Sequence, residues 1–166
     1  MQIVPQSDVA GLLDRLIEDE VPGRRGFEAW RSLLRAHATL MRRLDTDLER
    51  GTGLALADFD VLAQLSVAGG ELRMTELAAR ALISRSGMTR RVARLVDEGL
   101  VRRRTAGADR RGVAVALTDA GVARLAETAP AHVRGVSELF VAQLDDQELA
   151  ALKDALDKVS VDCAFG

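Results

Sequence analysis

The sequence predicts a mainly α-helical fold with a small β wing: a helix-turn-helix, a hairpin behind it, and long helices on both sides. Three observations lead to this prediction. Alanine and leucine supply most of the apolar residues, and aromatic residues make up only 3% of the 166 residues, which favours packed helices over sheets. Two helix signals separated by a tight turn occupy 75–98. Two extended runs, 100–105 and 113–117, then surround a polar loop.

The N-terminal part of the chain predicts an arm followed by one long helix. Residues 1–26 are expected to form a helical arm and linker, with a short amphipathic helix over 7–20. The region 27–55 is expected to be a dimerisation helix that begins at about Phe27 and ends at about Arg50, before two glycines. Its apolar stripe consists of Trp30, Leu33, Leu34, His37, Leu40, Met41, Leu44 and Leu48.

The region 56–118 predicts the winged helix-turn-helix itself. A helix over 56–68 lacks a capping side chain, because Ala55 precedes it, and a brief strand at 71–74 is expected to pair with the wing. Helices over 75–82 and 85–98 follow, with Ser84 as the N-cap of the second and Gly99 ending it. In the wing, alternation predicts two sets of side chains. The inward set is Val113, Val115 and Leu117, and the outward set is Ala114 and Ala116.

The region 119–166 predicts two C-terminal dimerisation helices. Thr118 is placed to cap the first of them, and Pro130 is expected to kink it. Asp145 and Glu148 have the spacing of a capping box for the second. The apolar stripes of the long helices are wider than one small core needs, so a homodimer is expected, with a compact monomer as the alternative.

Charge is concentrated in the helix-turn-helix and the wing. Residues 80–111 contain ten arginines and three acidic residues, a net charge of +7, whereas the rest of the chain has a net charge of −9. Three acids cannot pair ten arginines, so this stretch is expected to attract a polyanion. A helix-turn-helix places its second helix in the major groove of DNA, which makes double-stranded DNA the expected partner.

A helical wheel predicts which side chains reach the DNA. If Met88, Val92 and Leu95 face the core, polar residues lie on the opposite side, where arginine can pair with guanine. Arg85 and Arg91 lie to the side and are expected at phosphates, and a wing arginine suits the minor groove. The candidate DNA-binding residues are Thr75, Ser84, Arg85, Ser86, Thr89, Arg90, Arg94, Asp109, Arg110 and Arg111, with Asp109 bracing the turn.

Other chemistry finds no support in the sequence. Two histidines and one distant cysteine lack metal-ligand spacing, and we find no nucleophile triad, phosphate loop or paired carboxylates, so no metal, cofactor or enzymatic activity is expected. The single Cys163 is typical of a reducing cytoplasm, and no signal peptide or membrane-spanning run is visible. A cytoplasmic protein without membrane contact is the expectation.

Three segments together resemble the MarR family of bacterial transcription regulators. These are the motif starting at Met74-Thr-Glu-Leu, the run from Ser84 to Arg103, and the wing signature Asp109-Arg-Arg followed by Leu117-Thr-Asp-Ala-Gly. The resemblance covers roughly residues 27–160. It implies obligate dimers, a winged helix in each half, control by a small ligand in a crevice between the dimerisation and DNA-binding parts, and entry of Arg111 into the minor groove.

Two departures from the family pattern are visible. Ala55 stands where the family usually has a capping Ser or Thr, and Cys163 is at the wrong end for the redox-sensing branch. Asp60, Arg91 and Arg103 could match the urate-responsive branch, but Glu20 occupies the place of its tryptophan.

The leading hypothesis is a dimeric, sequence-specific DNA-binding regulator, a repressor released by a small phenolic or amphipathic effector. Its operator is expected to be a pseudo-palindrome. Trp30, His37 and Phe59 are the candidate ligand-binding residues, although a Trp and a His on an apolar stripe also fit plain packing. The alternative function is a winged-helix protein-interaction module that does not bind DNA.

Overall fold

The computed structural model describes residues 24–81, 83–105 and 113–163, and it divides into two units, 1–42 and 43–166. The described part of the first unit is helical and belongs to α2 (Arg24–Thr52), which begins three residues earlier than predicted. Four large apolar side chains of this unit are exposed to solvent: Trp30, Leu33, Leu34 and Met41. The predicted helix over 7–20 lies outside the described residues.

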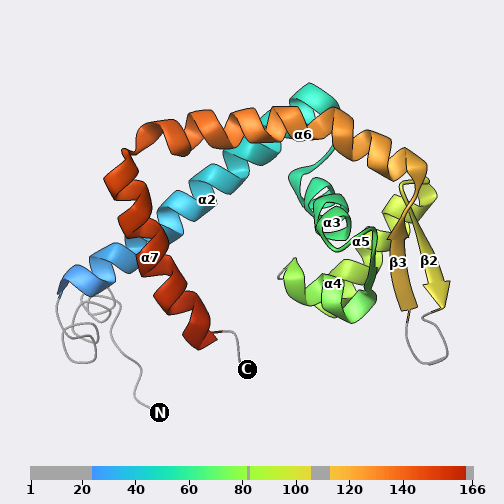
Figure 1. Ribbon diagram of the computed structural model, residues 1–166, viewed down its shortest axis with the longest axis horizontal. Coiled ribbons are helices and arrows are strands. Elements are labelled where there is room, and N and C mark those ends of the chain that lie inside the picture. The colour runs from blue at the N-terminus through green and yellow to red at the C-terminus, as the bar shows by residue number, and fades with distance from the viewer. Residues whose placement is uncertain (1–23, 82, 106–112, 164–166) are drawn as a thin grey trace, which may run out of the picture. The chain divides into compact units, whose positions relative to one another are not determined.

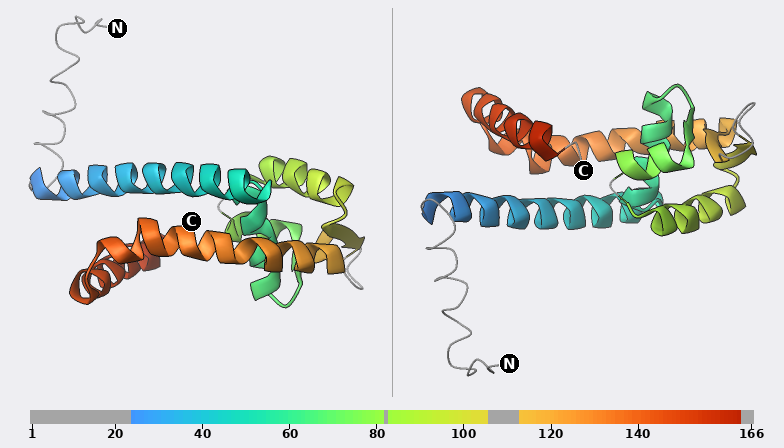
Figure 2. Two further views of the ribbon diagram at one scale, coloured as in Figure 1. Left: turned by 90° about the horizontal axis from the view of Figure 1, so that it is seen from above. Right: turned by 90° about the horizontal axis from the view of Figure 1, so that it is seen from below.

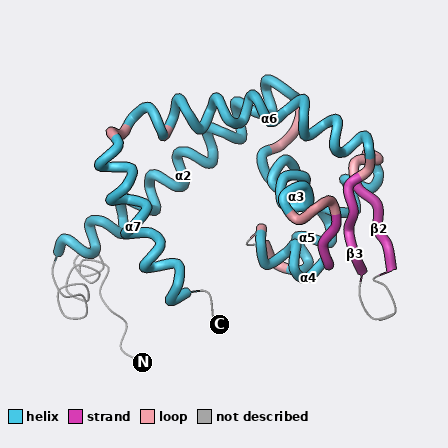
Figure 3. Tube along the Cα trace, viewed as in Figure 1, coloured by secondary structure: helices cyan, strands magenta, loops and turns pink. Residues whose placement is uncertain are grey.

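The second unit contains the end of α2 and all the other elements (Figure 1). In chain order these are α3 (Leu56–Val67), β1 (Glu71–Arg73), α4 (Met74–Arg80), α5 (Arg85–Asp97), β2 (Val101–Thr105), β3 (Val113–Leu117), α6 (Asp119–Leu139), the 3-10 helix η2 (Val141–Gln143) and α7 (Asp146–Cys163). Figure 3 shows the three strands gathered in one place, with helix making up most of the rest of this unit. The mainly α fold with a small β wing is therefore confirmed.

The wing belongs to a three-stranded antiparallel sheet with the order β1-β3-β2. Leu72 of β1 pairs with Val115, as predicted for a brief strand beside the wing, and Arg103 of β2 pairs with the other edge of Val115. Both views in Figure 2 place the start of α6 beside these strands. The sheet thus joins the helix-turn-helix to the long C-terminal helix.

The predicted inward and outward pattern of the wing is wrong at three residues. Val113 is exposed, whereas Ala114 and Ala116 are each only 3% exposed. The reason is that β3 is the central strand, so its small alanines are covered by long side chains from both neighbours. Arg104 of β2 and Glu71 of β1 form an ion pair of 3.4 Å across β3 on that face.

Local side-chain caps fix the starts of α5, α6 and α7 as predicted. Ser84 Oγ accepts from the Gly87 amide at 3.2 Å, and Thr118 Oγ1 accepts from the Gly121 amide at 3.0 Å. The Asp145–Glu148 capping box closes in both directions: Asp145 Oδ1 accepts from the Glu148 amide at 2.8 Å, and Glu148 Oε2 accepts from the Asp145 amide at 3.0 Å. These hydrogen bonds occupy amides that a helix start leaves unpaired.

The start of α3 is capped from outside the helix. Ala55 provides no side-chain cap, as the sequence indicates. Instead, Asp45 of α2 accepts a hydrogen bond of 2.8 Å from the Leu56 amide. A carboxylate at a helix N-terminus is also favoured by the helix dipole, so Asp45 replaces the missing cap and links α2 to α3.

The C-terminal helices differ in how well they are packed. α6 continues through Pro130 to Leu139, so the proline does not end the helix. Gly121 and Thr128 of α6 are buried, whereas no residue of α7 with a described side chain is fully buried. Leu149, Leu152 and Leu156 remain half-buried and Val159 is exposed, so much of the apolar stripe of α7 lacks cover within the described chain.

The interface of α3 and α6 contains a partly buried histidine whose charge state should affect stability. The rings of His132 and Phe59 lie 4.5 Å apart, and His132 Nδ1 has no hydrogen-bond partner among the described residues. Burial lowers the pKa of His132 from its usual 6.5, and the charge of Asp60 opposes this shift only in part. The folded protein therefore binds a proton at His132 less readily than the unfolded chain does.

We expect the free energy of unfolding to fall as the pH decreases through about 6.5, because the unfolded state then takes up the proton first. Above that pH both states are neutral at His132 and the contribution is fully present. Urea unfolding between about pH 5 and 8 measures this, and His132→Gln should flatten the dependence. A wild-type stability that rises towards acidic pH, or an unchanged slope in the variant, would contradict it.

Candidate nucleic-acid interface

The second helix of the helix-turn-helix, α5, is held by one apolar face. Met88, Val92 and Leu95 are fully buried, as the helical wheel predicts. On the opposite side Ser86 and Arg90 are exposed, with Thr89 exposed on the flank. Buried anchors of this kind fix the rotation of α5, so the short polar groups and Arg90 point away from the protein.

One groove lies between α5 and the sheet, and we call it the wing-side groove. Its volume is about 430 Å³, and it is lined by Arg73, Met74, Thr75, Arg85, Thr89, Arg103 and Val113. It brings together three of the predicted DNA-binding residues, Thr75, Arg85 and Thr89. Arg73, Arg85 and Arg103 all line this groove, and arginine side chains suit an anionic partner such as a DNA phosphate.

Arg73 and Arg103 of this groove are not among the DNA-binding residues that the sequence predicted. Arg103 pairs with Val115, so it lies on the sheet face that packs towards the core, and its Nη2 donates to the Thr89 carbonyl at 3.5 Å. Strand alternation was a usable signal, because it separates Arg103 from Arg102 and Arg104 on the other face. Arg102 donates to the Leu117 carbonyl at 3.1 Å, on that other face.

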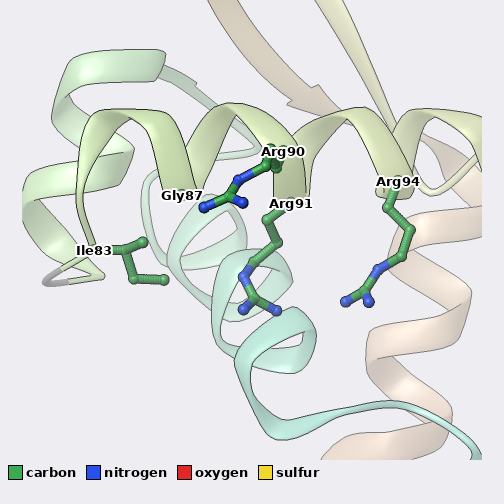
Figure 4. A pocket seen from close by; sticks show the side chains of 5 residues that line it. All are labelled: Ile83, Gly87, Arg90, Arg91 and Arg94. Atoms are coloured by element: carbon green, nitrogen blue, oxygen red, sulfur yellow. The ribbon is translucent and has the colours of Figure 1, made fainter.

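A second groove, the Asp58-side groove, runs along the other flank of α5. Its volume is about 300 Å³, and it is lined by Ile83, Gly87, Arg90, Arg91 and Arg94 (Figure 4). In the close-up, Arg91 and Arg94 extend away from α5 in the same general direction, whereas Arg90 lies nearer Gly87. Arg85 and Thr89 of α5 thus line one groove, and its other three arginines line the second.

A buried carboxylate joins two of these arginines to α3. Asp58 lies in the first turn of α3 and is 4% exposed. Its Oδ1 accepts from Arg91 Nη1 at 2.8 Å, and its Oδ2 accepts from Arg94 Nη2. The bond to Asp58 is the main cause of a raised pKa at Arg94, which therefore stays charged. Arg91 and Arg94 thus both pair with Asp58, and their expected contacts with a phosphate and a base stay predictions.

Acids from outside 80–111 also neutralise other arginines of the basic stretch. Arg80 pairs with Glu76 at 3.7 Å, and Arg104 pairs with Glu71. The free positive charge of 80–111 is therefore smaller than the acids within that stretch alone would leave. Within the described residues, no ion pair forms to Arg85, Arg90 or Arg103, so these three remain available to a polyanion.

The other predicted site residues lie outside the described residues or belong to different units of the chain. Asp109, Arg110 and Arg111 lie outside the described residues. Trp30 and His37 are exposed on α2 in the first unit, whereas Phe59 is buried in the core of the second. Among the described helices, none is long and apolar enough to cross a membrane. The described part of the chain also contains no cluster of His, Cys, Asp and Glu side chains suited to a metal ion.

The chain is similar to members of a known protein family. The MarR family model matches residues 52–112, which span α3 to the wing. The chain is 30% identical over 115 residues to the HTH-type transcriptional repressor YetL of Bacillus subtilis, covering 67% of this chain and 69% of that protein.

Two solved structures from Streptomyces coelicolor extend the similarity to most of the chain. The MarR family regulator AbsC is 30% identical, with a TM-score of 0.78 and coverage of 86% of this chain and 96% of that one. The MarR family regulator Sco3205, solved in complex with DNA, is 34% identical, with a TM-score of 0.77 and coverage of 84% and 91%. These relatives are regulators and not enzymes. The chain belongs to the MarR family of transcriptional regulators.

Proposed function

We propose that this chain acts as a homodimeric repressor that binds a pseudo-palindromic operator through α5 and the wing. The observation that carries the proposal is the outward face of α5, where Ser86 and Arg90 are exposed above a fully buried apolar anchor. Arg85 and Arg103 flank this face in the wing-side groove without ion-pair partners among the described residues. The name of the relative YetL supports repression as the direction of control.

Unpaired apolar side chains support a dimer. Trp30 and Leu34 of α2 are 51% and 48% exposed, and the stripe of α7 is only half covered. Exposed apolar side chains of this kind are typical of surfaces that another protein covers, and a second copy is the commonest occupant in a soluble oligomer. Two copies would present two α5 helices to half-sites about one helical turn, ~34 Å, apart.

A small aromatic or amphipathic effector would release the operator. Trp30 and His37 lie two turns apart on α2 and offer an aromatic ring and a titratable donor on one helix face. The family resemblance implies control by such a ligand. An effector that binds better to a dimer with altered spacing of the two α5 helices would lower operator affinity. Because Trp30 is the chain's single tryptophan, its fluorescence reports binding directly.

The proposal predicts a footprint on the DNA that flanks the chain's own gene. Gel shift and footprinting should show protection of two half-sites, and sedimentation of the complex should give two chains per operator. A panel of phenolic compounds should then weaken the shift and quench Trp30 fluorescence. A chain that sediments as a monomer, or that shifts no flanking fragment, would refute the repressor and would favour a protein-interaction module.

A further inference from the structure

We propose that Asp58 is a positioning residue that limits how many arginines of α5 can reach DNA, and thereby sets the ratio of specific to non-specific binding. This inference rests on the proposed DNA binding by α5. It deepens that proposal by assigning a role to a residue of α3 that lies outside the helix-turn-helix. Asp58 would leave Arg90 free to contact DNA while holding Arg91 and Arg94 back.

The carboxylate of Asp58 binds both Arg91 and Arg94. Each carboxylate oxygen accepts from a different guanidinium group, Oδ1 from Arg91 and Oδ2 from Arg94. The Asp58 side chain is 5% exposed, so it cannot exchange these partners for water at low cost. Arg91 Nε is itself buried without a hydrogen-bond partner among the described residues. Arg91 therefore depends on Asp58 for the charge compensation that its burial requires.

Arg94 is the arginine whose restraint matters most for DNA. Its side chain is 52% exposed, so it has access to a polyanion, yet its Nη2 is bound to Asp58. Its Nε also lies 3.9 Å from Glu98 Oε1, and Glu49 adds a further negative charge nearby. Arg94 is thus accessible but electrostatically satisfied, whereas Arg90 in the same groove has no ion-pair partner among the described residues.

This arrangement affects specificity because free arginines bind any phosphate. Each additional phosphate contact releases about 0.9 counterion, which steepens the salt dependence and raises affinity for every sequence alike. Specificity is the difference between two affinities, so it falls when only the sequence-independent part grows. By holding Arg91 and Arg94, Asp58 keeps that part small and leaves discrimination to the outward face of α5.

The test is Asp58→Asn, which keeps the side chain's size and removes its charge. One duplex is the sequence that the wild-type chain selects from a random library, and the other is a scrambled duplex of the same composition. We expect affinity for the scrambled duplex to rise about fivefold at 0.15 M salt for each released arginine. This factor follows from the release of about 0.9 counterion at each new phosphate contact. The slope of log K against log salt should steepen by about 0.9 for each released arginine, and the specificity ratio should fall.

Asp60→Asn is the matched control, because it removes the same charge from the same helix. Asp60 forms no ion pair with α5 among the described residues and accepts only a 3.5 Å hydrogen bond from Gln64. The double variant Asp58→Asn with Arg94→Gln should lose the gain in scrambled-duplex affinity, which shows that Arg94 carries it. Melting temperatures of all variants separate loss of folding from change in binding.

Equal gains from Asp58→Asn and Asp60→Asn, or no gain from folded Asp58→Asn, would overturn the role of Asp58. If Asp58→Asn does not fold, single variants decide instead: Arg94→Gln should reduce the salt slope less than Arg90→Gln, and equal reductions would overturn the inference. If the wild-type chain selects no sequence from the random library, the proposed sequence-specific function is refuted. The salt slopes measured on the scrambled duplex test the role of Asp58 separately from that selection.

Discussion

Replacing Gly121 by alanine should destabilise the protein by about 3 kcal/mol or more, at the upper end of what overpacking costs. A Cβ atom at Gly121 would lie 2.0 Å from the carbonyl oxygen of Leu100, a distance at which the backbone must move. That oxygen also accepts from the Thr118 amide and hydroxyl, each at 3.1 Å. The displacement would therefore break the start of α6 where it joins the wing.

Gly51→Ala provides the control for this prediction. Gly51 lies in α2, and apart from the adjacent helix backbone a Cβ atom there would have no neighbour within 4 Å, so an alanine meets no obstacle. Because alanine has a higher helix propensity than glycine, Gly51→Ala should leave stability unchanged or raise it by up to about 1 kcal/mol. Thermal and urea unfolding compare the two variants. A Gly121→Ala protein that melts with the wild type would show that α6 does not depend on this close approach.

Arg90→Ala should cost about 1–3 kcal/mol of operator affinity at each half-site, and twice that in a dimer, if Arg90 pairs with a guanine edge. Arg90 is exposed on the outward face of α5, and no ion pair within the described chain competes for it. The lost interaction is specific to one base, so preference should relax at one position of each half-site. Binding to a panel of operators with every base at each position measures both effects.

Arg104→Ala serves as the control for charge removal alone. Arg104 lies on the sheet face away from Arg103, where it pairs with Glu71. Its loss should change operator affinity little and leave base preference intact, because an exposed ion pair contributes only about 0–1 kcal/mol. Equal losses from the two variants, with no change in base preference, would reduce α5 to a general basic surface.

The sequence alone determined the features that depend on neighbours along the chain. Ser84, Thr118 and the Asp145–Glu148 pair cap their helices as predicted, because a cap joins residues three positions apart. The rotation of α5 was equally predictable, because one turn of helix sets which side chains share its apolar face. The family resemblance rests on these same local segments.

Tertiary structure decided which charges remain free and which faces are covered. Asp58 meets Arg91 and Arg94 across 33 and 36 residues, and Asp45 caps α3 across 11. Ala114 is buried because β3 lies between two other strands. The order of strands in the sheet decides this burial, and the alternation of residues along β3 does not predict it. Composition counts charges but not distances, and an ion pair forms only where folding brings its two groups within about 4 Å.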